Sequence, residues 1–174
     1  MIRLPKTLAD ARTRLAILTV KPADPRAIPL ATLNGAGAID ASCRILKSDY
    51  RLSPTGSDTV PDTELCSEGN AVTYGASNYE ATVTPFWYLD EDGKPDALED
   101  VVYQALKEKG TTLWLVEREG PRYDEPWAAG DAYEIYEVVT DNPQKPSDRG
   151  GYIKRTVPLG VQRAWLDGVV AAGA

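Results

Sequence analysis

The stretch YEATVTPFWYLD, residues 79–90, decides the fold class because two kinds of side chain alternate along it. Successive side chains of a β-strand point to opposite faces of the sheet. The stretch therefore predicts a strand with one apolar face and one mixed, more polar face. The apolar face would carry Tyr79, Ala81, Val83, Pro85, Trp87 and Leu89.

Other strand-like runs fill most of the remaining chain. They are rich in Trp, Tyr, Ile and Val and are separated by clusters of Gly, Pro and Asp, which is typical of strands and turns. Strands and helices do not alternate as they do in a parallel sheet, so the pattern favours an antiparallel sandwich or barrel. The predicted strands are residues 15–20, 39–46, 111–117, 132–140, 152–159 and 165–171.

One helix is predicted over residues 96–109. Asp96 can cap its amino end, Glu99 stands three positions later, and Gly110 ends it. Apolar residues recur at helical spacing, so one side of the helix should be buried against the sheet. These residues are Leu98, Val101, Val102, Ala105 and Leu106.

Two segments contain few strand signals. Residues 1–37 hold Pro22, Pro25 and Pro29 and are expected to form an amino-terminal arm, with residues 38–174 as the β domain. Deletion of residues 1–25 should then impair assembly more than folding. Residues 53–68 are dense in turn formers and are expected to form a long loop. The predicted fold class is mainly β: an antiparallel β-sandwich or barrel with a flanking helix, a long loop and a terminal arm.

Composition argues against an active site. The chain has no histidine and only two cysteines, Cys43 and Cys66, whose spacing fits neither a metal site nor a disulfide framework. The acidic residues are interpreted as exposed charge rather than as a catalytic pair. We therefore predict no catalytic, cofactor-binding or metal-binding residues.

Two short motifs have ordinary structural explanations. Asn34-Gly35-Ala36-Gly37 lacks the Lys-Ser or Lys-Thr of a phosphate-binding loop and is interpreted as a turn. Asp90, Asp92 and Asp96 resemble the start of a calcium loop, but Lys94 occupies a ligand position, so a solvated turn before the helix is favoured.

Charge is distributed unevenly along the chain. Residues 1–51 hold nine basic and four acidic side chains, net +5, whereas residues 52–174 hold ten and twenty-two, net −12. The overall net charge of −7 argues against tight binding of nucleic acid. Opposite charges at the two ends could attract neighbouring copies, although a basic arm on an acidic domain explains them equally well.

From residue 58 onward the order of elements resembles the major tail tube protein family of bacteriophages with long, non-contractile tails. The resemblance rests on Asp58-Thr59-Val60, the alternating strand 79–89, the helix 96–109, the strand GTTLWLVER (110–118) and the turn WAAGD (127–131). It covers about two thirds of the chain and depends on order rather than on any invariant residue.

The resemblance implies a structural virion protein whose six copies form a ring. Such rings stack head to tail into a tube, and loops and arms bridge neighbouring copies. The expected partners are other copies of the chain, together with tape measure, tail terminator and distal tail proteins. DNA would pass through the lumen without tight binding. We expect assembly in the host cytoplasm and no membrane association.

Three alternatives remain open from the sequence. Another tail or neck component, such as a tail terminator or connector, would form a single ring rather than stacks. A carboxylate-dependent hydrolase would need a buried acidic pair. A β-sandwich module that binds carbohydrate would need exposed flat faces on Trp87, Trp114, Trp127 and Trp165.

Overall fold

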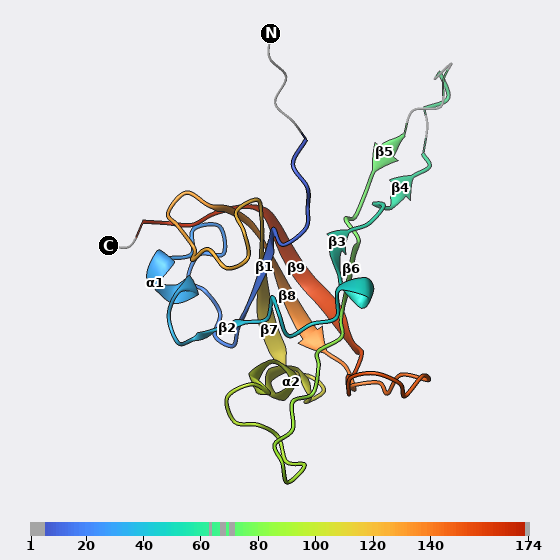
Figure 1. Cartoon of the computed structure of the whole chain (residues 1–174). Coiled ribbons are helices and arrows are strands. Elements are labelled where there is room, and N and C mark those ends of the chain that lie inside the picture. Colours follow the sequence, from blue (N-terminus) through green and yellow to red (C-terminus); the bar gives the residue numbers. More distant parts are fainter. Residues whose placement is uncertain (1–5, 63, 67–68, 70–71, 173–174) are drawn as a thin grey trace.

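The computed structural model describes residues 6–62, 64–66, 69 and 72–172. Within these residues one seven-stranded sheet has antiparallel neighbours throughout, in the order β2, β1, β7, β8, β9, β6, β3 (Figure 1). Its strands are β1 (Thr13–Leu18), β2 (Ala38–Asp40), β3 (Arg51–Pro54), β6 (Tyr79–Val83), β7 (Thr112–Glu119), β8 (Ala132–Thr140) and β9 (Val157–Val169). A separate pair, β4 (Thr59–Val60) and β5 (Thr73–Tyr74), and the helices α1 (Leu30–Leu33), η1 (Lys47–Asp49) and α2 (Val101–Leu106) complete the fold.

Strands β7 and β8 form the centre of the sheet. Their β-branched and aromatic residues suit a pleated surface that is covered on both faces. The two strands pair from Thr112 opposite Val139 to Glu117 opposite Glu134. Both lie where the sequence predicts them, within two residues at each end.

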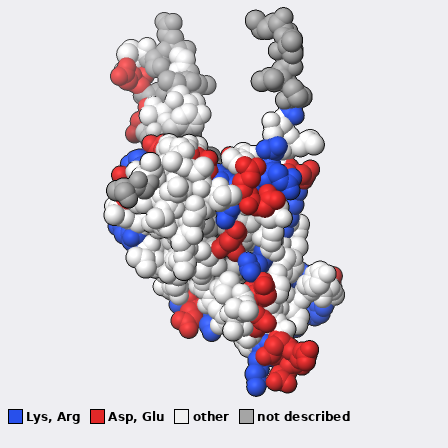
Figure 2. Space-filling view, turned by 60° about the vertical axis from the view of Figure 1, so that its left-hand side comes forward, with Lys and Arg blue, Asp and Glu red and all other residues white. Residues whose placement is uncertain are grey.

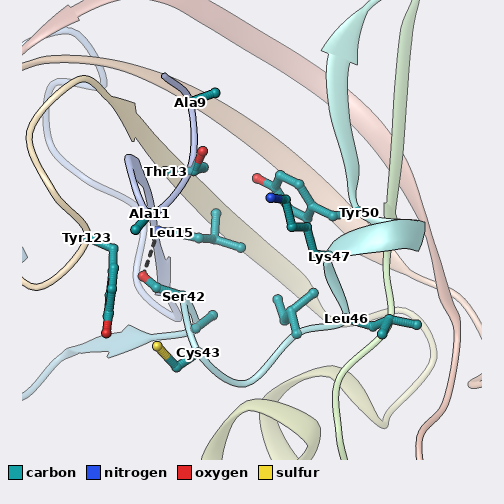
Figure 3. Close-up of a pocket in the computed structure, with 12 residues that line it drawn as sticks. Ala9, Ala11, Thr13, Leu15, Ser42, Cys43, Leu46, Lys47, Tyr50 and Tyr123 are labelled. Carbon is teal, nitrogen blue, oxygen red and sulfur yellow. Dashed lines mark hydrogen bonds between the residues drawn. The ribbon is translucent and has the colours of Figure 1, made fainter. Parts of the chain in front are cut away.

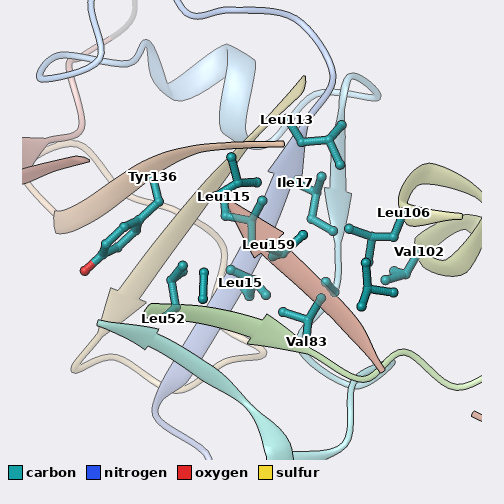
Figure 4. Close-up of a cluster of buried hydrophobic side chains, with 14 residues drawn as sticks. Leu15, Ile17, Leu52, Val83, Val102, Leu106, Leu113, Leu115, Tyr136 and Leu159 are labelled. Atoms are coloured by element: carbon teal, nitrogen blue, oxygen red, sulfur yellow. The ribbon is translucent and has the colours of Figure 1, made fainter. Parts of the chain in front are cut away.

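The sheet curls, and the chain beyond β2 meets the chain beyond β6. The backbone N–H of Leu46, beyond β2, donates to the carbonyl of Thr84, beyond β6, at 2.9 Å, and Phe86 donates back to Arg44 at 3.0 Å. The concave face encloses the main hydrophobic core, against which α2 packs (Figure 4). The predicted class, mainly β and antiparallel with one short flanking helix, is confirmed. The core residues include Leu15, Ile17, Leu52, Val83, Val102, Leu106, Leu115, Tyr136, Val138 and Leu159.

A second core lies on the opposite face of the sheet. The segment after β1 crosses this face and buries Ile28 and Leu33 beside Trp114 and Trp127. Residues 13–37, which the sequence assigned to an arm, thus supply a strand between β2 and β7 and the cover of this core. The prolines that suggested an arm lie in the crossing segment, where they interrupt no ladder.

The predicted helix is shorter than expected. Asp96 does cap its start, because its carboxylate accepts from the N–H groups of Leu98 and Glu99 at 2.8 Å. The chain makes turns from residue 97 to residue 100, however, and only Val101–Leu106 is helical. Val102 and Leu106 are buried as predicted, whereas Leu98 is 81% exposed, so its predicted burial is wrong.

Four predicted strands have other limits in the structure. Asp40 ends β2 well before residue 46, because its carboxylate accepts from both the backbone N–H and the hydroxyl of Ser42 and turns the chain. Strand β6 ends at Val83, two residues before Pro85. The two runs 152–159 and 165–171 are replaced by a single thirteen-residue strand, β9, which continues through Gly160.

Candidate assembly surfaces

A long hairpin leaves the body of the molecule (Figure 1). It begins where β3 pairs with β6 and continues through hydrogen bonds from Thr55 to Asn78 at 2.8 Å and from Asp58 to Ala76 at 2.9 Å. Beyond these bonds β4 pairs with β5. The predicted loop 53–68 therefore includes strand residues, and its turn formers lie in a ladder whose two sides both face solvent.

The outer part of this hairpin exposes apolar side chains. Leu65 is 107% exposed, and Val60, Val72 and Tyr74 are exposed as well. Apolar groups grouped on a narrow projection contribute nothing to the core of their own subunit, and such patches mark interaction sites. We define the hairpin tip by its described residues 58–62, 64–66 and 72–75.

The hairpin also carries charge of one sign. From Leu52 to Gly93 the sequence contains no lysine or arginine, whereas Asp58, Asp62 and Glu64 lie in the hairpin tip. Figure 2 shows acidic side chains in red along the projecting hairpin. The absence of basic residues is visible in the sequence. It could have indicated that this segment forms an interaction surface and is more than a connecting loop.

Strand β9 offers an open edge. On one side β8 follows it from Leu159 to Val169. On the other side β6 pairs with it only from Val157 to Leu159, and at the far end Val169 donates to the carbonyl of Arg26. Between these contacts, residues 161–167 have no strand partner on that side among the described residues. Such an edge can pair with another chain.

A cluster of acids and tyrosines occupies the concave face of β7 and β8. Glu117 lies directly opposite Glu134, and each carboxylate accepts from a tyrosine hydroxyl, that of Tyr50 and that of Tyr136 respectively. Burial raises the pKa of Glu117 to about 7, and the negative charges of Glu119 and Glu134 add to the effect. The expectation that all acidic residues are exposed is wrong for Glu117. Glu117 can therefore hold a proton near neutral pH.

An apolar pocket lies beside the base of the hairpin (Figure 3). Its volume is about 470 Å³, and eleven of its twelve lining residues come from the first fifty positions of the chain. Leu15, Ile45 and Leu46 line it, and Tyr50 separates it from β3. Cys43, an exposed free thiol, lies at its edge. A pocket of this size and lining can receive apolar side chains.

The motifs weighed in the sequence are structural. The side-chain amide of Asn34 exchanges two hydrogen bonds with the backbone of Trp127, at 3.0 and 3.1 Å, and so joins two loops. Asp90 accepts from the N–H groups of Asp92 and Lys94, which makes it the organiser of a tight turn. Within the described part of the chain, no three His, Cys, Asp or Glu residues are grouped closely enough to hold a metal ion.

The tryptophans do not form a flat binding surface. Trp114 and Trp127 are buried, and the ring of Trp127 lies under the guanidinium group of Arg118 at 5.0 Å. Trp87 is covered in part by Tyr103 and by Arg155. Stacking on a sugar needs an open ring face, so this arrangement disfavours the carbohydrate-binding alternative.

No helix of the described residues is long and apolar enough to cross a membrane. No curated protein sequence matches the chain. Among solved structures, a chain of the cryo-EM structure of the anti-feeding prophage baseplate, 6-fold symmetrised, is similar in fold. The TM-score is 0.54 at 12% sequence identity, with 94% of this chain and 99% of that chain covered.

The family model described as phage tail tube protein matches residues 1–174, the whole chain. This match confirms the tail tube part of the resemblance noted from the order of elements. The chain therefore belongs to the phage tail tube protein family, and it is a structural component of a virion rather than an enzyme.

Proposed function

We propose that the chain is the major tail tube protein of a phage, that six copies close into a ring, and that rings stack head to tail into the tube that conducts DNA. The observation that carries this proposal is the acidic hairpin with its exposed apolar tip. It has the form of an element that contacts another copy. A contact between two different surfaces of identical copies repeats without limit along an axis, as a tube requires.

The open edge of β9 supports the ring. Pairing of this edge with a neighbouring copy would protect it from unspecific strand addition and would extend the sheet around the ring. The six-fold symmetry named for the similar baseplate structure gives the expected number of copies. The net charge of −7 on each copy would weaken adhesion of DNA phosphates to the wall of the lumen.

The expected partners in the virion are tape measure, tail terminator and distal tail proteins. We assign the tube to a long, non-contractile tail because the order of elements in the sequence resembles that class. A sheath protein bound around the native tube would contradict this assignment.

Assembly is tested directly on the purified protein. Concentrated protein should show hollow tubes in negative-stain images, and light scattering should fall as salt is raised from about 0.05 to about 0.5 M, because screening weakens the charged contacts between copies. Protein that remains monomeric at every concentration would contradict the proposal.

A hairpin variant separates a tube protein from a tail terminator. Replacing residues 56–77 by an Asn-Gly turn keeps β3 and β6 paired and removes only the projecting part. We expect this variant to keep the melting temperature of the parent and to lose stacking. If the parent protein itself stops at single rings, the terminator alternative is correct instead.

A further inference from the structure

The pocket beside the hairpin base exposes an apolar interior. Apart from Thr13, Ser42, Cys43, Lys47 and Tyr50, its wall is formed by alanines and branched aliphatic residues together with Tyr123. At its rim Lys47 pairs with Asp10 at 2.8 Å, and both side chains are exposed. An exposed ion pair is weak and can rearrange when another charged group approaches.

The hairpin of the same subunit cannot fill this pocket. It starts at Tyr50, in the pocket wall, and runs away from the body (Figures 1 and 3). From Arg51 to Val60 the chain is extended, and at about 3.3 Å per residue it carries β4 about 30 Å from the pocket. If the hairpin folded back to the pocket of its own subunit, the pairing between β3 and β6 would break.

The tip and the pocket are complementary in chemistry. The tip presents Leu65 beside Asp62 and Glu64 and contains no basic residue. The pocket has an apolar interior, and its one charged lining residue is Lys47, which pairs with Asp10. An apolar side chain flanked by carboxylates suits such a pocket, because the side chain can enter the apolar interior while a carboxylate takes the place of Asp10 at Lys47.

We propose that the hairpin tip of one copy docks into this pocket of another copy, with Leu65 as the anchor that enters it. This inference rests on the proposed function and names the two surfaces that meet. The donor uses its tip and the acceptor uses its pocket, so every copy has one of each and the contact propagates.

The positions of the two cysteines allow this contact to be tested. Cys43 lines the pocket, and Cys66 follows the anchor Leu65 directly in the sequence. Both are free and exposed, and they belong to opposite sides of the proposed contact. Docking would bring Cys66 of one copy close to Cys43 of the next.

The experiment oxidises assembled tubes with diamide. Two thiols lose two protons and two electrons to form a disulfide, and diamide takes them up as it is reduced. Because each copy has one cysteine on each side of the contact, we expect a ladder of dimers, trimers and longer species on a non-reducing gel. Peptide mapping should identify Cys43 joined to Cys66.

Two serine variants serve as matched controls. C43S alone and C66S alone should give no cross-linked species, and an equal mixture of the two should stop at dimers. Dimers formed by either variant alone would show a contact between identical cysteines and would overturn the inference.

The anchor is tested separately from the cysteines. Because Leu65 has no contact with the core of its own subunit, Leu65→Asp should leave the melting temperature unchanged. It should raise the concentration needed for tube formation by about tenfold or more, as expected for a central anchor. Leu65→Met, which keeps an apolar side chain of similar volume, should assemble like the parent.

The outcomes distinguish this inference from the proposed function. Tubes that form normally but give no link between Cys43 and Cys66, or that form equally well with Leu65→Asp, would overturn the docking and leave the tube function intact. Failure of the parent protein to form any rings or tubes would overturn both.

Discussion

The burial of the Glu117 carboxylate depends on the curvature of the sheet. In a flat sheet its carboxylate would meet water, but the curled sheet brings Tyr50 over it and leaves it buried. The tyrosine hydroxyl that donates to it favours its ionised form, yet desolvation has the larger effect and raises the pKa to about 7. Glu117 therefore weakens the fold when it is ionised.

The first prediction concerns the pH dependence of stability. The pKa of Glu117 is higher in the folded state than the usual value of about 4.5, so its proton is bound more tightly after folding. The contribution of Glu117 to the free energy of unfolding is complete below pH 4.5, falls as the pH rises to 7, and is lost above pH 7. By linkage the loss is about 3 kcal/mol. Glu117→Gln should flatten the unfolding free energy across this window and raise it at pH 8.

A matched variant identifies the cause. Glu91 is exposed in the turn before α2, so Glu91→Gln removes the same charge without changing a buried group. We expect its pH profile, measured by urea denaturation, to follow that of the parent. If the unfolding free energy of Glu117→Gln depended on pH as steeply as that of the parent, the carboxylate of Glu117 would not be the source of the pH dependence.

Arg118, the next residue along β7, points to the opposite face and is 1% exposed. Its Nη1 donates to the carboxylate of Asp131 at 2.7 Å and to the carbonyl of Pro126, and its Nη2 donates to two further carbonyls of the loop 120–131. No spacing in the sequence indicates this role, because most of the partners are backbone atoms whose position depends on the folded loop. Contacts of this kind, between a buried side chain and the backbone of a folded loop, could therefore not be predicted from the sequence.

Helix α2 illustrates a rule at the scale of an element: a cap predicts where a helical turn starts but not how long the helix is. Asp96 caps a turn as expected, yet the buried side begins only at Val101. Most helical stability comes from packing on the core. Leu98 precedes the part that contacts the core and remains exposed.

The second prediction compares two substitutions in this element. Val102→Asp places an unpaired charge in the main core and should destabilise the fold by about 3 to 5 kcal/mol. Leu98→Asp introduces the same carboxylate at an exposed position and should change the stability by less than about 0.5 kcal/mol. Thermal melting of the two variants measures both effects. Equal losses would mean that α2 does not pack as described.

The strands were predictable where one pattern governed them. For β7 and β8 the aromatic and branched residues, the turns and the burial agree, and the predicted limits hold within two residues. Strand β9 was predicted as two strands, 152–159 and 165–171; in the structure β8 pairs along the stretch between them and holds it extended. The limits of such a strand depend on pairing partners that lie far away in the sequence.

At the scale of the whole molecule, the amino-terminal residues belong to two different regions. From Thr13 onward they form β1, which pairs with β7 over six positions and contributes to both cores. Lys6 and Leu8 are exposed. Because a deletion of residues 1–25 includes β1, we now expect it to impair folding as well as assembly, and not mainly assembly.

The third prediction is a pair of truncations. Removal of residues 1–8 should leave the melting temperature within a few degrees of the parent, because no described core contact is lost. Removal of residues 1–20 takes away β1 and should abolish cooperative unfolding. Circular dichroism during heating measures both. A cooperative transition in the longer truncation would show that β2 and β7 can do without the strand between them.

The order of strands in the sheet has a consequence for protein synthesis. Strand β1 emerges from the ribosome early, but its longest partner, β7, follows about a hundred residues later, and β6 must wait for β9 at the end of the chain. At about 5 to 20 residues per second, β1 waits for β7, and β6 for β9, for several seconds or longer, while each has only its other, shorter neighbour, β2 or β3, available. A chain whose translation stops before β9 cannot complete the sheet. Prematurely terminated products thus lack the body that holds both pocket and hairpin, and they cannot enter a growing assembly and block it.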